Sequence, residues 1–171
     1  MKPLPAILLD PAEKNNLIAW RLHQSQWRKS WQRGVGSQKV GGRWSLPGRA
    51  VVYAALDPAT AILEVAVNSG FAALDANPYD LARIEILRPD LVHVVQPADL
   101  PNPRWLTTNS PIPSQQRFGD HLLNEHPIIV IPSAVSTNSW NILIDVKSGA
   151  KAFKGRLHER FALDTRLAPI A

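Results

Sequence analysis

Residues 41–68 read Gly41-Gly42-Arg43-Trp44-Ser45-Leu46-Pro47-Gly48, then Arg49-Ala50-Val51-Val52-Tyr53-Ala54-Ala55-Leu56, then Asp57-Pro58-Ala59-Thr60-Ala61-Ile62-Leu63-Glu64-Val65-Ala66-Val67-Asn68, and the rest of the chain is organised around them. Its three parts predict a glycine-rich turn, an apolar strand and a helix. Asp57 is suited to accept a hydrogen bond from the free amides at the helix start, and Pro58 fits the first helical position. Apolar residues on both sides of the helix predict that it is buried nearly all round.

Glu64 is the only charged residue between Pro58 and Gly70. A carboxylate in such a helix needs a partner, because burying an unpaired charge is costly. Two interpretations stay open from the helix alone. Glu64 is either a structural residue paired with an arginine or the carboxylate of a functional site.

Upstream of this stretch, residues 17–22 predict a strand with Ile18, Trp20 and Leu22 on one face and Arg21 on the other. Arg21 would then be either a ligand-binding cation on a rigid element or half of a strand-edge salt bridge. Residues 24–40 are polar, basic and irregular, and fit a loop that could close over a ligand. Trp27 and Trp31 within it are expected in the core.

Downstream, the pattern favours strands over helices and mixes their order. It predicts a loop from the helix to Tyr79, strands at 81–87, 91–95, 128–133, 140–145 and 160–167, a long ordered loop at 97–113 and a helix at 114–125. Ser133 ends a buried strand, and His93 is expected to be a packed or surface histidine. The fold class is therefore α+β, a single domain over residues 1–171 with its core at about 17–167.

Composition excludes several classes of protein. The chain has no cysteine, and its five histidines lack paired spacing, so we expect no disulfide and no metal site. No apolar run reaches the roughly 18 residues of a membrane span, and no signal-peptide pattern is present. We therefore expect a cytoplasmic protein without membrane association.

Charge is unevenly distributed along the chain. Residues 1–50 hold nine Lys/Arg against two Asp/Glu, whereas residues 51–171 hold ten against twelve. A local basic surface attracts phosphates, either on a small molecule or on a nucleic acid. A solvated basic face without a ligand is the alternative.

With these residues in view, the chain resembles the RES family, which is named for an Arg, a Glu and a Ser. Here those residues are Arg21, Glu64 and Ser133. The resemblance runs from about Ala19 to Leu167. It rests on the order and spacing of Trp20-Arg21-Leu22, Gly41-Gly42-Arg43-Trp44, Val51-Val52-Tyr53, Leu63-Glu64-Val65, Phe118-Gly119-Asp120, Val130-Ile131-Pro132-Ser133 and Asp164-Thr165-Arg166-Leu167.

The resemblance implies an ADP-ribosyltransferase-like mixed β-sheet core with few helices. It implies the toxin of a bacterial toxin–antitoxin pair that consumes NAD⁺ by hydrolysis or phosphorolysis of the nicotinamide–ribose bond, with no permanently bound cofactor. The implied partner is an Xre-type helix-turn-helix antitoxin, and contact with nucleic acid is expected only through that antitoxin. The protein could also form a homo-oligomer. One segment departs from the family: its Asn-Pro-x-His-like pattern is replaced here by residues 144–149.

The chemistry assigns a role to each residue of this set. Glu64 would stabilise the positive charge that develops on the ribose, with Arg21 and Ser133 as further catalytic residues. Ser133 would hydrogen-bond substrate or Glu64 rather than attack. Arg21 and Arg43 would bind the pyrophosphate, Gly41 and Gly42 would let the backbone approach the ligand, and Tyr53 would stack on nicotinamide or pack in the core.

Two other functions stay open. A nucleic-acid-binding module would use the basic first part of the chain and the six tryptophans, although no reader motif is visible. An ADP-ribosyltransferase that modifies a macromolecule would use the same Arg, Tyr and Glu. We also expect the partner to cover a basic mouth around Arg21, Arg43 and Arg49.

Overall fold

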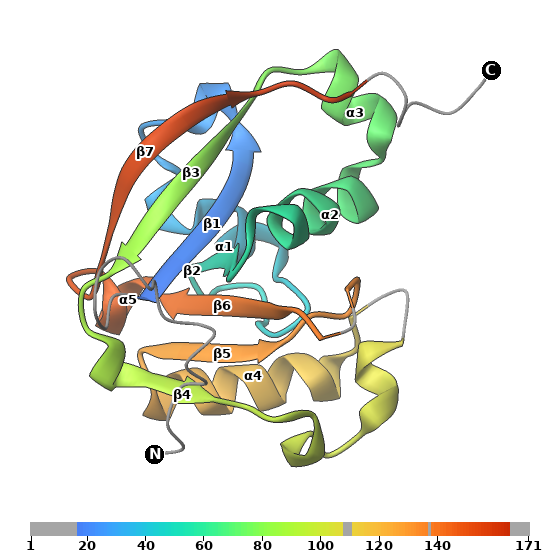
Figure 1. Ribbon diagram of the computed structural model, residues 1–171. Helices are drawn as coiled ribbons and strands as arrows, with labels where there is room; N and C mark the ends of the chain where they lie inside the picture. The colour runs from blue at the N-terminus through green and yellow to red at the C-terminus, as the bar shows by residue number, and fades with distance from the viewer. Residues whose placement is uncertain (1–16, 108–110, 137, 165–171) are drawn as a thin grey trace.

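The computed structural model describes residues 17–107, 111–136 and 138–164 (Figure 1). A seven-stranded sheet has the order β4-β5-β6-β2-β1-β3-β7. The strands are β1 (Leu17–Gln24), β2 (Val51–Ala55), β3 (Tyr79–Ile86), β4 (Val92–Val94), β5 (Ile128–Pro132), β6 (Trp140–Asp145) and β7 (Phe153–Phe161). The α-helices are α1 (Val35–Val40), α2 (Pro58–Ser69), α3 (Phe71–Ala76), α4 (Pro113–Glu125) and α5 (Val146–Gly149). Short 3₁₀ helices lie at Ser25–Trp27, Trp31–Arg33, Pro89–Leu91, Pro97–Asp99 and Pro103–Leu106.

The sheet is mixed, which confirms the predicted α+β class. Strands β4 and β5 pair in parallel, and the other neighbouring strands pair antiparallel. Figure 1 shows two groups of strands that run at a steep angle to each other, β1, β3 and β7 in one and β4, β5 and β6 in the other, with β2 between them.

The two groups meet at a narrow junction. Strand β1 pairs with β3 along eight residues, but it pairs with β2 only at Trp20 and Ala55. Helix α2 lies beside this junction and contacts β1, β2 and β6. The helix therefore bridges both groups of strands at the place where the sheet itself is least continuous.

Buried apolar residues form three clusters. The largest follows one face of the sheet and includes Ala19, Val52, Ile84, Ile128 and Ile144. A second lies under α4 and contains Trp44, Trp105 and Leu143. A third joins α2 and α3 to β1 and β3 through residues that include Leu22, Ala66 and Leu74. Helix α4 thus packs on one cluster, and α2 and α3 share another.

Helix α2 begins as predicted, but it is not buried all round. The Asp57 carboxylate accepts from the Thr60 amide at 2.7 Å, and Pro58 occupies the first turn. Leu63 and Val67, however, are 39% and 65% exposed. The helix covers the junction with one face only, so its other apolar face meets solvent; an apolar pattern on all sides does not distinguish these two faces.

Three other predictions are wrong in part. Helix α3 replaces part of the predicted loop before Tyr79. Residues 24–40 contain α1 and two 3₁₀ helices; Trp31 is buried as expected, but Trp27 is 54% exposed. The last strand is Phe153–Phe161 rather than 160–167, because charged residues on this edge strand hide its pattern. Residues 165–167 lie outside the described part of the chain.

The remaining strand predictions are confirmed within a few residues. In β3, Ala82, Ile84 and Ile86 are buried, whereas Arg83 and Glu85 are partly exposed, as the alternation predicts. Where the structure describes the chain, none of its helices has the length and hydropathy to span a bilayer.

Candidate active site

Glu64 is held by two neutral donors from the β5–β6 part of the sheet. Its Oε1 atom accepts a hydrogen bond from the Ser133 hydroxyl at 2.9 Å and from the Asn141 side-chain amide at 2.5 Å. Glu64 lies in the middle of α2, Ser133 directly follows β5, and Asn141 is the second residue of β6. Three separate elements therefore meet at one carboxylate oxygen.

The hydroxyl of Ser133 is oriented by the turn that follows β5. Its Oγ accepts hydrogen bonds from the amides of Val135 and Ser136, each at 3.2 Å. These two bonds direct the hydroxyl proton toward Glu64, so Ser133 makes the hydrogen bond to Glu64 that the sequence suggested. Its part in catalysis stays a prediction.

A structural ion pair does not account for Glu64. Among the described residues, the salt bridges do not include Glu64, and its partners are an amide and a hydroxyl. The arginine partner of the structural interpretation is therefore missing from this part of the chain. The half-buried carboxylate thus has neutral hydrogen-bond partners and no salt bridge to a cation of the described residues.

Tyr53 is held by the glycine-rich turn. Its hydroxyl accepts from the Trp44 amide at 3.2 Å and shares a hydrogen bond of 2.8 Å with the Ser45 hydroxyl. Burial raises the pKa of Tyr53, so the phenol stays neutral. A Cβ atom on Gly42 would lie 2.5 Å from the phenol oxygen, and Gly41 has φ +76° with Ser45 O 2.9 Å from where its Cβ would be. Both glycines are required by this close packing, while their contact with a ligand stays a prediction.

Tyr53 and the Glu64 cluster share one face of the sheet. In the β2–β6 pair, Tyr53 lies opposite Leu143, and Ala55 lies opposite Asn141. Tyr53 and Asn141 are therefore diagonal neighbours on the same face, with Cα atoms roughly 7–8 Å apart. Tyr53 also packs against the apolar cluster under α4, so both the core role and the ligand role remain compatible with its position.

Arg21 joins this region from the narrow junction of the sheet. It follows Trp20, the β1 residue that pairs with β2, and its Nη1 donates to the Tyr53 carbonyl. Burial lowers the pKa of Arg21 to about 10, so it remains charged at neutral pH. Its buried Nε has no hydrogen-bond partner among the described residues. Among the described residues Arg21 forms no salt bridge, so the structural alternative has no support in this part of the chain.

The predicted basic mouth is only partly formed. Arg43, on the glycine-rich turn, donates to the Trp105 carbonyl at 3.1 Å and lies close enough to Tyr53 to affect its pKa. Arg49 lies just before β2, at the end of the strand that is farther from Asn141. There it contacts Asp120 at 3.1 Å and Asp145 at 3.0 Å. Two carboxylates compensate its charge, so Arg49 is not part of the candidate site.

Two residues of this site were missed by the sequence reasoning, Asn141 and Ser45. Asn141 is the one amide within the apolar run of β6, and Ser45 stands among the bulky residues of the turn. Both are buried polar side chains. A polar residue inside an apolar strand was the available signal for Asn141, because such a group requires a partner when buried.

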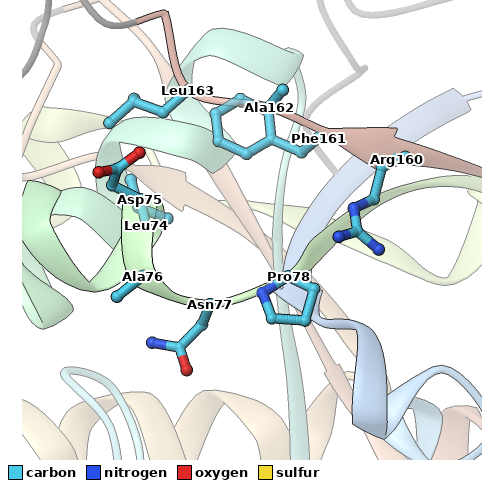
Figure 2. A pocket seen from close by; sticks show the side chains of 9 residues that line it. All are labelled: Leu74, Asp75, Ala76, Asn77, Pro78, Arg160, Phe161, Ala162 and Leu163. Carbon is cyan, nitrogen blue, oxygen red and sulfur yellow. The ribbon is translucent and has the colours of Figure 1, made fainter.

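A surface hollow lies elsewhere on the molecule, between the end of α3 and the end of β7 (Figure 2). Its lining consists of Leu74, Asp75, Ala76, Asn77, Pro78, Arg160, Phe161, Ala162 and Leu163. None of the predicted site residues lines it. Within the described ranges, no cluster of His, Asp and Glu is arranged to hold a metal ion.

Comparisons with known proteins agree on one family. The sequence profile of the RES domain matches residues 18–164. A protein of Pseudomonas putida named "Toxin Res" is 33% identical over 140 residues, covering 78% of this chain and 90% of its own length. A "Toxin Res" of Photorhabdus laumondii is 30% identical over 88% of this chain and 97% of its own. The "Prs ADP-ribosylating toxin" of a Sphingobium species is 31% identical over 78% of this chain and 84% of its own.

A solved structure shares the fold. It is the M. tuberculosis MbcT–MbcA toxin–antitoxin complex, one chain of which superposes with a TM-score of 0.66 at 14% identity. The match covers 85% of this chain and 84% of that chain. At this identity the similarity supports the arrangement of the elements and nothing finer.

Proposed function

The chain belongs to the RES domain family, and on that premise we propose that it is the toxin of a toxin–antitoxin pair that depletes NAD⁺ by cleaving the nicotinamide–ribose bond. The observation that carries the proposal is the state of Glu64. Its carboxylate is held by Ser133 and Asn141, two neutral donors, and no cation among the described residues compensates its charge.

This arrangement suits a reaction in which positive charge appears on the substrate. The C1′–N bond of NAD⁺ breaks, its electron pair leaves with nicotinamide, and the ribose becomes oxocarbenium-like. A carboxylate fixed beside the ribose stabilises that charge, which is greatest in the transition state. An oxygen of water or phosphate then bonds to C1′; with water, one proton is released. Nicotinamide leaves neutral, so a second catalytic acid is unnecessary.

The other residues are assigned to substrate binding. Arg21 and Arg43 approach Tyr53 from different elements and present guanidinium groups that match a pyrophosphate. The Tyr53 hydroxyl is occupied by the turn, which leaves only its ring for a ligand. A neutral aromatic ring is suited to stack on the cationic nicotinamide ring. Gly41 and Gly42 keep the turn close to this ring.

A second candidate function has one specific observation in its favour. The Sphingobium relative, 31% identical, carries the name "Prs ADP-ribosylating toxin". Transfer of ADP-ribose to a protein would use the same carboxylate and the same leaving group, with a nucleophile of the target protein in place of water or phosphate. The candidate site is compatible with either acceptor.

For the partner, we propose an antitoxin, of the Xre helix-turn-helix type, that closes the substrate site. Two relatives bear the name "Toxin Res", and the structural neighbour was solved as a toxin–antitoxin complex. Because Arg49 is neutralised at the far end of β2, the partner's acidic or carboxylate-ended segment would approach Arg21 and Arg43 instead. Co-expression of a candidate helix-turn-helix antitoxin, with growth as the readout, checks the pairing.

One incubation distinguishes the candidate activities. Purified protein is mixed with NAD⁺ labelled on the adenine, in buffer with and without phosphate, and then with added cell proteins. Release of nicotinamide without any protein acceptor supports NAD⁺ depletion, and the labelled product, ADP-ribose or its phosphate ester, identifies the acceptor. Label found only on an added protein supports ADP-ribosylation. Intact NAD⁺ in every mixture would contradict both.

A further inference from the structure

Asn141 presents two different groups to its surroundings. Its Nδ2 donates to Glu64 Oε1 at 2.5 Å, which assigns the amide nitrogen, since a carboxylate can only accept. Its Oδ1 is buried, and no described residue donates to it. The side chain of Asn141 is therefore satisfied on one side and unsatisfied on the other.

An unsatisfied buried carbonyl requires an explanation. Asn141 is only 7% exposed, and it lies between Ile131 of β5 and Ala55 of β2 in the sheet. Neither of these apolar side chains can donate a hydrogen bond. A buried acceptor without a donor lowers stability, so such groups are rare unless a ligand or a water satisfies them.

Glu64 has the same asymmetry. Both of its donors, Ser133 and Asn141, bind Oε1, and no hydrogen bond from the described residues reaches Oε2. Two acceptors of the cluster therefore lack a donor among the described residues, Oε2 of Glu64 and Oδ1 of Asn141. A ligand that fits must bring two donors on neighbouring atoms, which is the chemistry of a vicinal diol.

We propose that Asn141 is a positioning and substrate-binding residue, whose amide orients Glu64 while its carbonyl accepts a hydrogen bond from a ribose hydroxyl. This inference rests on the proposed function, because it makes the nicotinamide-bearing ribose the group that Glu64 and Asn141 bind together. A purely structural asparagine would have its carbonyl paired within the protein or with a bound water.

The first test does not depend on turnover. The Glu64 carboxyl is labelled with ¹³C and titrated by NMR in wild-type protein, in Asn141→Asp and in Asn77→Ala, a control on an exposed asparagine. Asn141→Asp keeps the shape of the side chain and its acceptor Oδ1. It replaces the donor Nδ2 with an oxygen, so that a second carboxyl group faces Glu64. We expect the Glu64 titration to move to higher pH in Asn141→Asp alone, because two adjacent carboxylates resist ionising together. An unchanged titration would overturn the positioning role.

The second test separates ribose binding from general damage. Calorimetry measures the affinity of wild type, Asn141→Ala and Asn77→Ala for ADP-ribose and for ADP, which lacks the second ribose. We expect Asn141→Ala to bind ADP-ribose about tenfold more weakly, the effect of one lost hydrogen bond, and ADP as well as wild type does. Equal losses for both ligands, or no loss for either, would contradict ribose recognition by Asn141.

The wild-type protein provides a check that no substitution can compromise. The side-chain ¹⁵N–¹H signals of Asn141 should shift when ADP-ribose is added and stay unchanged with ADP. If ADP-ribose binds and shifts these signals while NAD⁺ is never consumed, the proposed reaction fails but the role of Asn141 stands. If NAD⁺ is consumed and Asn141→Ala behaves like wild type, the reaction stands and the role of Asn141 is refuted.

Discussion

The two ends of the β2–β6 pair hold carboxylates in opposite ways. At the Val51 end, Asp145 accepts from Arg49 at 3.0 Å and caps α5 through the Ser148 amide at 2.9 Å. At the Ala55 end, Asn141 donates to Glu64, and no cation among the described residues takes part. Asn141 and Asp145 are four residues apart on one face of β6, so roughly 13 Å of strand separates a compensated charge from an uncompensated one.

This difference indicates which carboxylate is structural. A buried charge that only stabilises the fold requires an opposite charge, and Asp145 has one. A catalytic carboxylate that stabilises a cationic transition state would contribute less to the rate if an arginine already neutralised its charge. The departure from the family at residues 144–149 falls at the structural end, where Asp145 begins α5 and binds Arg49. It is thus separated from Glu64, Ser133 and Asn141.

The largest effect should come from Glu64→Gln. This change keeps the shape of the side chain and removes its charge, so NAD⁺ turnover should fall on the order of 10²–10³-fold, the usual loss when one electrostatic contribution to a transition state is removed. Nicotinamide release by chromatography measures turnover, and circular dichroism checks the fold.

The control for this change is Glu159→Gln on the exposed edge strand β7, which should leave turnover unchanged. Near-wild-type turnover of Glu64→Gln would show that Glu64 is structural, and the contrast between the two ends of β2 would then be lost.

At the other end, Asp145→Ala should lower stability and spare the chemistry. The change removes a helix cap and one partner of Arg49, and we expect the free energy of unfolding to fall by about 1–3 kcal/mol. Denaturant titration measures this loss, with Asp75→Ala on the exposed part of α3 as the control. A large loss of turnover per folded molecule would mean that the structural end also serves the reaction.

Tyr53→Phe tests the residue at the middle of β2, between these two ends. Removing the hydroxyl leaves the Trp44 amide and the Ser45 hydroxyl without this partner, so stability should fall by about 1 kcal/mol. Turnover should fall much less than in Tyr53→Ala, since the phenylalanine ring can still stack on nicotinamide. Equal turnover of the two variants would argue that Tyr53 serves only the core.

The smallest effect is a change in the pH dependence of stability. Burial, together with the stacked ring of His126, lowers the pKa of His93 below its ordinary value. The unfolded chain then binds more protons, so the stabilisation is complete above about pH 6.5 and is lost as the pH falls below that value.

His93→Phe should therefore make stability depend less on pH below 6.5, and it should not alter the pH profile of turnover. Thermal melts and nicotinamide release across the same buffers give both readings. A changed turnover profile would link this histidine stack to the candidate site.

Most elements could be predicted from sequence because their residues alternate or repeat clearly. Strand β3 has alternating buried residues, and α2 has a cap and a first-turn proline. Strand β7 could not be located accurately, since an edge strand needs charge on its exposed side and loses the apolar pattern. Trp27 and Trp31 show another limit: their spacing suits one core face, but a chain of short 3₁₀ helices directs only Trp31 inward.

The candidate site was predictable where a residue conflicts with its surroundings. Glu64 is a single charge in an apolar helix, and its need for a partner was visible in the sequence. Its actual partners were not, because Ser133 and Asn141 are 69 and 77 residues away and only strand pairing brings them there. The sequence also could not separate Arg49 from Arg21 and Arg43, because the carboxylates that pair with Arg49, Asp120 and Asp145, lie far along the chain.

The cap of α2 has a geometric consequence. An α-helix turns by about 100° per residue, so the direction of each side chain depends on how many residues separate it from a fixed point. Asp57 supplies that fixed point by binding the Thr60 amide at 2.7 Å, and Glu64 follows it by seven positions, close to two full turns. Inserting one alanine after Thr60 would preserve every residue named in the site, yet it would rotate the carboxylate by about 100° away from Ser133 and Asn141. The interval from Asp57 to Glu64 is therefore as much a part of the site as the residues at its two ends.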